Sequence, residues 1–179
     1  MTDRSIPTRI DQAWREAQDW IVEFDGSPTI TLLVDVPPAK VEPGLHSLSQ
    51  EGENFRISVI SSGLQDGAEF IPIETFSGYF TSLRGGNLEE LSVNYAVRRE
   101  AFDLDVHMVI YPLRNEKVSL ELVWWSDQVF SEETDNAAQF TALMEYFISL
   151  QNLFAAAGLY ISPESGLHAG EALEGWVEV

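Results

Sequence analysis

Three successive stretches of alternating residues constrain the fold of this chain more than any other feature. Between about residues 88 and 126, apolar side chains occupy every second position of each stretch. Successive side chains of a β-strand point to opposite sides of a sheet, so this pattern predicts strands with one face on helices and the other partly wet. The short connections Arg99–Ala101 and Arg114–Glu116 favour an antiparallel meander. The predicted strands cover 91–98, 102–111 and 118–125.

Helical periodicity predicts elements at both ends of the chain. Apolar residues recur at steps of three and four over about 9–24 and over 136–157. Thr134 or Asp135 can cap the second helix, and Gly158 can end it. Each helix has an apolar stripe that it must bury, and the meander offers a sheet face for this purpose.

Residues 69–84 fit two different elements. As a strand, the segment places its phenylalanines on one face; as a helix, its apolar residues align at steps of three and four. Pro72 suits a first helical turn and Gly85–Gly86 suits a C-terminal cap. We therefore predict a helix over 72–84.

The remaining segments are less regular. The pattern predicts strands over 29–36 and 55–59, and the Pro-, Gly- and Ser-rich segment 37–53 is expected to hold at most a short strand near 45–48. The tail 159–179 is expected to be a loop, with a final strand at 176–179 as the alternative for its end. In the first strand, one face is expected to carry Ile30, Leu32, Val34 and Val36.

These elements indicate one α+β domain over 1–179, with an antiparallel sheet and two or three helices packed against it. The ends and the tail are rich in polar and small residues. We expect 1–7 and about 163–175 to be flexible.

The charge of the chain is strongly negative. It has 29 acidic and 10 basic residues, a net charge of −19, and no Lys or Arg after Lys117. Direct nucleic-acid binding through phosphate neutralisation is therefore not expected. Such a surface favours solubility, or a basic protein partner.

Several kinds of chemistry are excluded or lack a motif. The chain has no cysteine, so disulfides, thiol nucleophiles and cysteine-ligated metals are excluded. It has no phosphate-binding glycine loop, no dinucleotide fingerprint and no serine nucleophile elbow. No cofactor is predicted, and the sequence favours a non-catalytic protein. The N-terminus lacks a signal peptide and no long apolar run is present, so we expect a cytoplasmic protein without a membrane span.

One predicted strand carries residues with metal-ligand character. Asp103, Asp105 and His107 share a face of this strand, and Glu121 comes from the next strand. Two carboxylates and one imidazole with open positions suit a divalent metal. The simpler interpretation is a wet strand face, with Arg98 beside Asp103, since alternate residues lie about 7 Å apart.

Other polar residues fit ordinary structural roles. His46 is expected in a solvated loop, and His168 is not aligned with an acid by any predicted helix. Glu89–Glu90 is expected at an exposed strand start.

Two features predict contact surfaces. Trp124 and Trp125 are adjacent in a strand, so one faces the helices and the other, Trp125, faces outward, either under a covering element or at a binding face. The helix 136–157 is apolar around most of its circumference, so it is either central in the domain or covered by a second subunit. We predict a homodimer or protein partner whose interface includes Tyr146, Ile148, Leu150, Leu153 and Phe154.

In element order, size and acidity the chain is similar to bacterial secretion chaperones, and acidic toxin-immunity proteins share the same bulk features. The similarity covers the order of elements over most of the chain and rests on no motif, so it implies no site residues. It implies a non-catalytic, acidic protein-interaction module: an escort chaperone, an immunity protein or an adaptor. The alternatives are a small metal-assisted hydrolase or ligand-binding protein using the face of Asp103, Asp105 and His107, and an acidic mimic of nucleic acid.

Overall fold

A computed structural model describes residues 5–22, 28–61, 68–113, 116–163 and 176–179. These residues form a single antiparallel sheet of eight strands and four α-helices, which confirms the predicted α+β class. The strands are β1 (Pro28–Val36), β2 (Glu53–Ile60), β3 (Glu69–Ile71), β4 (Glu90–Arg98), β5 (Asp103–Pro112), β6 (Val118–Trp125), β7 (Gly158–Ser162) and β8 (Val177–Glu178).

The sheet runs in the order β3-β2-β4-β5-β6-β1-β7-β8. The predicted meander is confirmed, because β4, β5 and β6 are neighbours and pair antiparallel. Asn94 lies opposite His107 and Arg98 lies opposite Asp103, as a tight connection between the first two strands requires. The N-terminal β1 adds to the far edge of this meander and pairs with β6 and β7.

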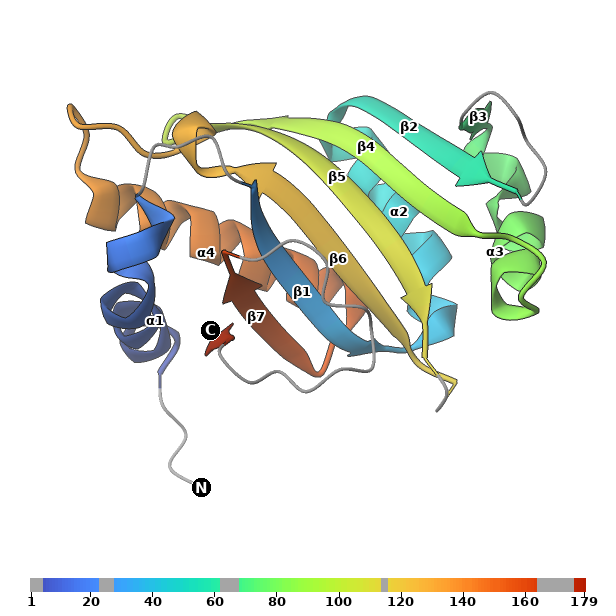
Figure 1. The fold of residues 1–179 in the computed structure, drawn as a ribbon, viewed down its shortest axis with the longest axis horizontal. Coiled ribbons are helices and arrows are strands. Elements are labelled where there is room, and N and C mark those ends of the chain that lie inside the picture. The colour runs from blue at the N-terminus through green and yellow to red at the C-terminus, as the bar shows by residue number, and fades with distance from the viewer. Residues whose placement is uncertain (1–4, 23–27, 62–67, 114–115, 164–175) are drawn as a thin grey trace.

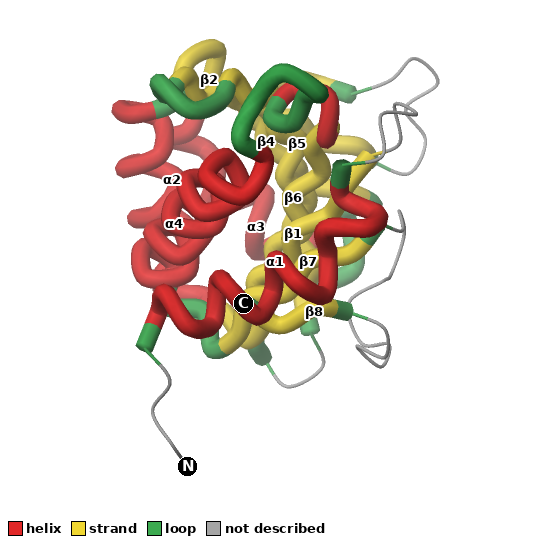
Figure 2. Tube along the Cα trace, turned by 90° about the vertical axis from the view of Figure 1, so that its left-hand side faces the viewer, coloured by secondary structure: helices red, strands yellow, loops and turns green. Residues whose placement is uncertain are grey.

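The helices are α1 (Ile6–Ile21), α2 (Pro38–Glu51), α3 (Phe76–Arg84) and α4 (Asn136–Phe154). Figure 1 shows α2 and α4 behind the sheet, and Figure 2 places these two helices on one side of the strands, with α1 crossing in front of the strands in that view. Helix α4 contacts both α1 and α2, and α1 also contacts β8. None of the described helices combines the length and apolar character that a membrane crossing needs.

The core lies between α4 and the centre of the sheet. Trp124 is fully buried, its ring packs against Phe147, and its indole N–H donates to the Thr31 hydroxyl at 3.0 Å. The Asp135 side chain accepts from the backbone N–H of Ala138, which confirms the predicted cap of α4.

Segment 37–53 is helical over Pro38–Glu51, so the expected short strand near 45–48 is wrong. Val41, Leu45 and Leu48 recur at helical spacing and are all buried. Pro38 lies in the first turn, where proline is tolerated. The Pro, Gly and Ser content lowers the intrinsic helix propensity of this segment, so its sequence did not predict a helix. The helix is amphipathic, and packing of its apolar side stabilises it.

The face assignment of β1 is also corrected. Val36 and Leu33 lie in the helix-side core, whereas Ile30 and Leu32 point to the other side of the sheet. The register shifts between Leu33 and Val36, and Asp35 has a φ of 56°. This irregularity inserts a residue that moves Val36 to the opposite face.

The last part of the chain differs from the expected loop. Helix α4 ends at Phe154, where Ala155 takes the left-handed conformation with a φ of 52°, and not at Gly158. Gly158 instead begins β7, and the backbone N–H of Ala157 already donates to Val34 of β1. The possible final strand is confirmed as β8, and Val179 follows it into the core.

Segment 69–84 contains both elements that its sequence allows. Residues 69–71 form β3, a short 3-10 helix covers Ile73–Thr75, and the predicted helix is confirmed over Phe76–Arg84. Of the two segments expected to be flexible, 1–4 and 164–175 lie outside the described residues, and Ile6 already begins α1.

Candidate functional site

The sheet face opposite α2 and α4, which we call the open face, is covered by no helix among the described residues (Figures 1 and 2). Strand alternation places polar side chains on it from the central strands. Those that matter here are Arg56, Ser58, Ser92, Asn94, Asp105, His107 and Glu121.

A hollow of about 670 Å³ crosses the open face over β2, β4, β5 and β6. Its lining mixes amides, charges and one large aromatic ring, and includes Asn54, Arg56, Asn94, His107 and Trp125. Antiparallel pairing of the four strands brings these residues together from distant parts of the chain.

Most polar groups of the hollow are held by neighbours. The His107 imidazole and the Asn94 side-chain oxygen are 2.8 Å apart, and the other ring nitrogen of His107 lies 3.9 Å from Glu90. Arg98 donates to the Asp105 carboxylate at 3.0 Å. Asp105 is therefore an ion-pair partner at the rim of the hollow rather than an isolated carboxylate.

The predicted metal ligands lie on one face but do not converge. Asp105 is engaged by Arg98, and Glu121 lies opposite Val109 rather than opposite His107. Asp103 lies at the exposed start of β5. No group of three or more His, Asp or Glu side chains within the described ranges is placed to hold a metal ion. The metal site stays a prediction that elemental analysis of the purified protein would test.

Glu121 is the most buried carboxylate of the open face, with 5% of its surface exposed. Burial, together with the charges of Glu121 and Glu90, raises the pKa of Tyr111 to about 12. This part of the face therefore holds Tyr111 in its neutral, protonated form far above neutral pH.

Two large aromatic side chains of the open face, Phe70 and Trp125, are exposed. Trp125 at the end of β6 is 42% exposed, which confirms that the two adjacent tryptophans point to opposite sides. Phe70 on β3 is 61% exposed, and the Arg56 guanidinium lies over its ring at 5.6 Å. Exposed rings of this size are common where a protein contacts a partner.

The end of the sheet that carries Trp125 is acidic. After β6 the chain passes through a short 3-10 helix, Ser126–Gln128, and an exposed segment that leads to α4 (Figure 1). Gln128 ties this connection to β5, because its side-chain oxygen accepts from the Asp105 backbone N–H. The exposed acids here, which we call the acidic rim, are Asp103, Asp127, Glu132, Glu133 and Asp135.

The predicted interface on α4 is buried within the chain. Tyr146, Ile148, Leu150 and Phe154 are buried, and Leu153 is half-buried against the core. The Tyr146 hydroxyl donates to the Tyr95 hydroxyl of β4 at 3.0 Å. The sheet, α1 and α2 together cover α4, so the apolar circumference of this helix gives no argument for a second subunit. The homodimer stays a prediction for a measurement of oligomeric state.

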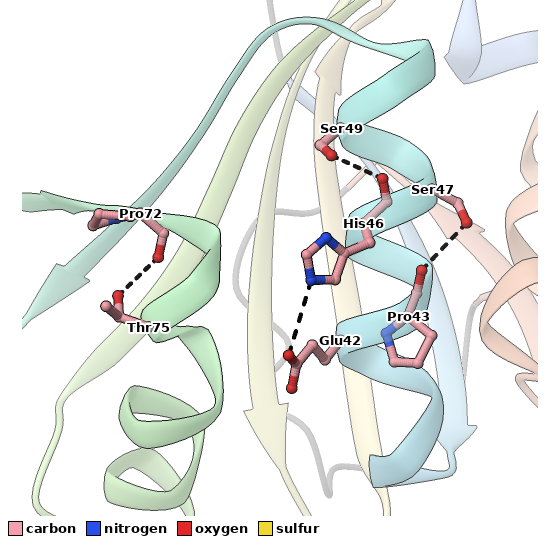
Figure 3. Close-up of polar contacts among 7 residues, drawn as sticks. All are labelled: Glu42, Pro43, His46, Ser47, Ser49, Pro72 and Thr75. Atoms are coloured by element: carbon pink, nitrogen blue, oxygen red, sulfur yellow. Dashed lines mark hydrogen bonds and ion pairs between the residues drawn. The ribbon is translucent and has the colours of Figure 1, made fainter.

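The other residues singled out by sequence play structural roles. His46 lies in α2 rather than in a loop, and it is 3.9 Å from Glu42 one turn earlier (Figure 3). The same view shows the Thr75 hydroxyl donating to the Pro72 carbonyl at the start of the α3 region. Glu90 begins β4 as expected, and His168 lies outside the described residues.

Sequence reasoning missed the β2 and β3 side of this face. The alternation of residues 55–59 implied that Asn54, Arg56 and Ser58 share the other face, but nothing local placed β2 beside β4. Phe70 lies two residues before the predicted helix 72–84, in a three-residue strand that is too short to show a periodic pattern. The pairing of distant strands decided both positions.

No protein-family model matches the sequence, and no curated protein matches it. Among solved structures, the chain is similar to one in the crystal structure of the toxic C-terminal tip of CdiA from Pseudomonas aeruginosa in complex with an immune protein. The sequence identity is 13% and the TM-score is 0.44, over 78% of this chain and 87% of that chain. At this level of similarity we take neither a function nor a residue role from that structure.

Proposed function

We propose that this chain is a non-catalytic protein-interaction module that binds a protein partner through the open face of its sheet. The observation that carries the proposal is the exposure of Trp125 beside the hollow, on a face that no described helix covers. Large aromatic residues at the centre of a contact surface supply much of the binding energy in protein complexes.

The spacing of the exposed aromatics favours a macromolecule over a small ligand. Phe70 belongs to β3 and Trp125 to β6, with β2, β4 and β5 between them. Neighbouring strands lie about 4.8 Å apart, so the two strands are separated by roughly 19 Å. A partner that contacts both rings must span most of the open face, as a protein does.

The polar groups of the hollow support binding rather than chemistry. His107 is held by Asn94, and Asp105 is held by Arg98. Side chains held by neighbours are positioned in advance, which lowers the entropy lost when a partner docks.

Site-specific photocrosslinking tests the proposal. We would replace Phe70 with benzoyl-phenylalanine, irradiate cells that express the chain, and identify any covalent partner by mass spectrometry. We expect a discrete partner adduct whose yield falls several-fold when Trp125→Ala is added, because a central aromatic is lost. The matched control carries the photoreactive residue at Ile6, which is also exposed but lies on α1.

Equal adducts from positions 70 and 6, or no adduct from position 70, would contradict the proposal. Circular dichroism of each variant shows whether it is folded. Trp125 is already 42% exposed, so its replacement by Ala is not expected to unfold the chain.

A further inference from the structure

We infer that the Trp125 end of the open face receives a basic segment of the protein partner, with an arginine side chain stacked on the Trp125 ring. This inference rests on the proposed function, and it names the chemistry of the partner. Three observations on the same end of the molecule carry it: the exposed ring, the hollow beside it and the acidic rim.

The exposed ring supplies the stacking surface. Tryptophan has the most favourable face for a cation, and the planar guanidinium of arginine stacks on aromatic rings. The chain already uses this contact elsewhere on the same face, where Arg56 lies over Phe70. Trp125 offers a comparable ring at the other end of the face, where the surrounding charge is negative.

The acidic rim supplies the charge complementarity. Asp127 follows Trp125 by two residues, and Glu132, Glu133 and Asp135 occupy the exposed segment before α4. Arg56 lines the hollow and lies over the Phe70 ring, and Arg98 is paired with Asp105, so these two arginines stand against five exposed acids of the rim. A basic segment would be drawn to this end and its arginine oriented over the ring.

The same charges argue against other occupants. A second copy of this chain carries the same net charge of −19 and the same acidic rim, so two such ends repel each other. An apolar segment would fill the hollow but would leave the exposed carboxylates of the acidic rim without a cationic partner. A basic protein segment is therefore the occupant that can both stack on the Trp125 ring and pair with the carboxylates of the acidic rim.

The test uses the full chain and two matched probes. One is a blocked peptide of alternating glycine and arginine, and the other replaces each arginine with citrulline, which has nearly the same shape but no charge. Binding is followed through the indole N–H resonance of Trp125 in ¹⁵N-labelled protein, assigned with Trp125→Phe. We expect the arginine peptide to shift this resonance and the citrulline peptide to bind several-fold more weakly.

Variants distinguish the contribution of the Trp125 ring to peptide binding from that of the acidic rim. Trp125→Ala, followed at the His107 amide, is expected to weaken the arginine peptide about two- to fivefold. Glu132→Gln with Glu133→Gln should weaken it further. The charge-matched control, Glu42→Gln with Glu74→Gln, removes a partly exposed acid from α2 and an exposed acid from the turn before α3, and it should have little effect.

Equal binding of the two peptides, or an equal loss from the rim and control variants, would overturn the inference. If position 70 crosslinks to a partner but the chain shows no preference for the arginine peptide, the proposed function stands. Only the inference of a basic partner segment is then wrong. Absence of a crosslinked partner would remove the proposed function itself.

Discussion

The side chains of the open face show how single residues acquire their properties from the sheet. Tyr111, Glu90 and Glu121 are far apart in sequence, yet antiparallel pairing places their charges close enough to act on one phenol. The His107–Asn94 contact arises in the same way, across β4 and β5. Taken alone, these polar residue types would be expected in contact with solvent and with ordinary pKa values. Their neighbours on the adjacent strands determine their contacts and, for Tyr111, the pKa.

Tyr111 provides a pH prediction at the residue scale. Its pKa is raised to about 12 in the folded chain, against 10 for an unperturbed tyrosine. Between these values the folded chain keeps a proton that the unfolded chain releases, so stability falls as pH rises from 10 to 12. Tyr111→Phe should therefore lose less stability than the wild type over this range, by at most about 1 kcal/mol because solvent screens the group.

Urea denaturation at a series of pH values measures this effect. The wild type and Tyr111→Phe are compared by their change with pH, which cancels any constant effect of removing the hydroxyl. The two curves should be parallel from pH 7 to 9, and above pH 10 the stability of the wild type should fall more steeply than that of Tyr111→Phe. Parallel curves up to pH 12 would show that the Tyr111 pKa is not raised.

The helices show how packing overrides local composition. Helix α2 contains Pro43 and Gly44, which are both poor helix formers. Gly44 lies directly against the Phe154 ring of α4, and a Cβ at this position would overlap that ring. The glycine allows two helices to approach closely, and this contact explains why a segment of such composition is helical here.

Gly44→Ala is therefore predicted to destabilise the protein, although alanine is the better helix former. The intrinsic gain is about 1 kcal/mol, whereas an extra methyl group in a packed core costs roughly 1–3 kcal/mol. We expect a net loss of up to about 2 kcal/mol in the free energy of unfolding. Urea or thermal denaturation measures it.

Gly78→Ala serves as the matched control. Gly78 lies in α3, and a Cβ there meets no atom within 4 Å. This variant should be neutral or more stable by up to about 1 kcal/mol. A stabilised Gly44→Ala would show that Phe154 moves aside without loss, and that α2 and α4 are not closely packed.

At the scale of the whole molecule, charge is the dominant property. A net charge of −19 on 179 residues means that folding concentrates like charges. The described Arg98–Asp105 pair is exposed, and such pairs contribute little to stability. The acidic rim that we assign to partner binding is therefore also a site of self-repulsion.

Salt is predicted to stabilise the chain. At about 0.1 M the Debye length falls to roughly 10 Å, so long-range repulsion between surface acids is screened. The thermal midpoint should rise between low salt and about 0.2 M NaCl, by roughly 2–4 °C for each kcal/mol of repulsion removed. Differential scanning calorimetry with NaCl and with KCl gives the measurement and separates screening from specific ion binding.

A variant with Glu132→Gln, Glu133→Gln and Asp135→Asn should show a smaller rise, because three of the repelling charges are gone. Asp135 also caps α4, so this variant is compared through its salt dependence and not through its absolute midpoint. A flat or falling midpoint for the wild type would mean that specific ion pairs dominate over bulk repulsion.

The sequence by itself determined the features that depend on neighbours along the chain. Alternation fixed the meander, and with it the opposite directions of Trp124 and Trp125 and the shared face of Asp105 and His107, because side-chain direction in a strand is a local property. The net charge of −19 likewise follows from the composition and does not depend on the fold. These features include the ring and much of the charge of the candidate site.

The tertiary structure alone decided everything that depends on contacts between distant segments. Helix α2 exists because its apolar residues and Gly44 fit against the core and α4. Val36 changes sides because of an irregularity where β1 pairs with β6, and α4 is covered because α1 and α2 flank it. The hollow joins β2 to β6, which no local pattern relates. Periodicity reports that a residue must be buried, whereas only long-range packing determines what buries it.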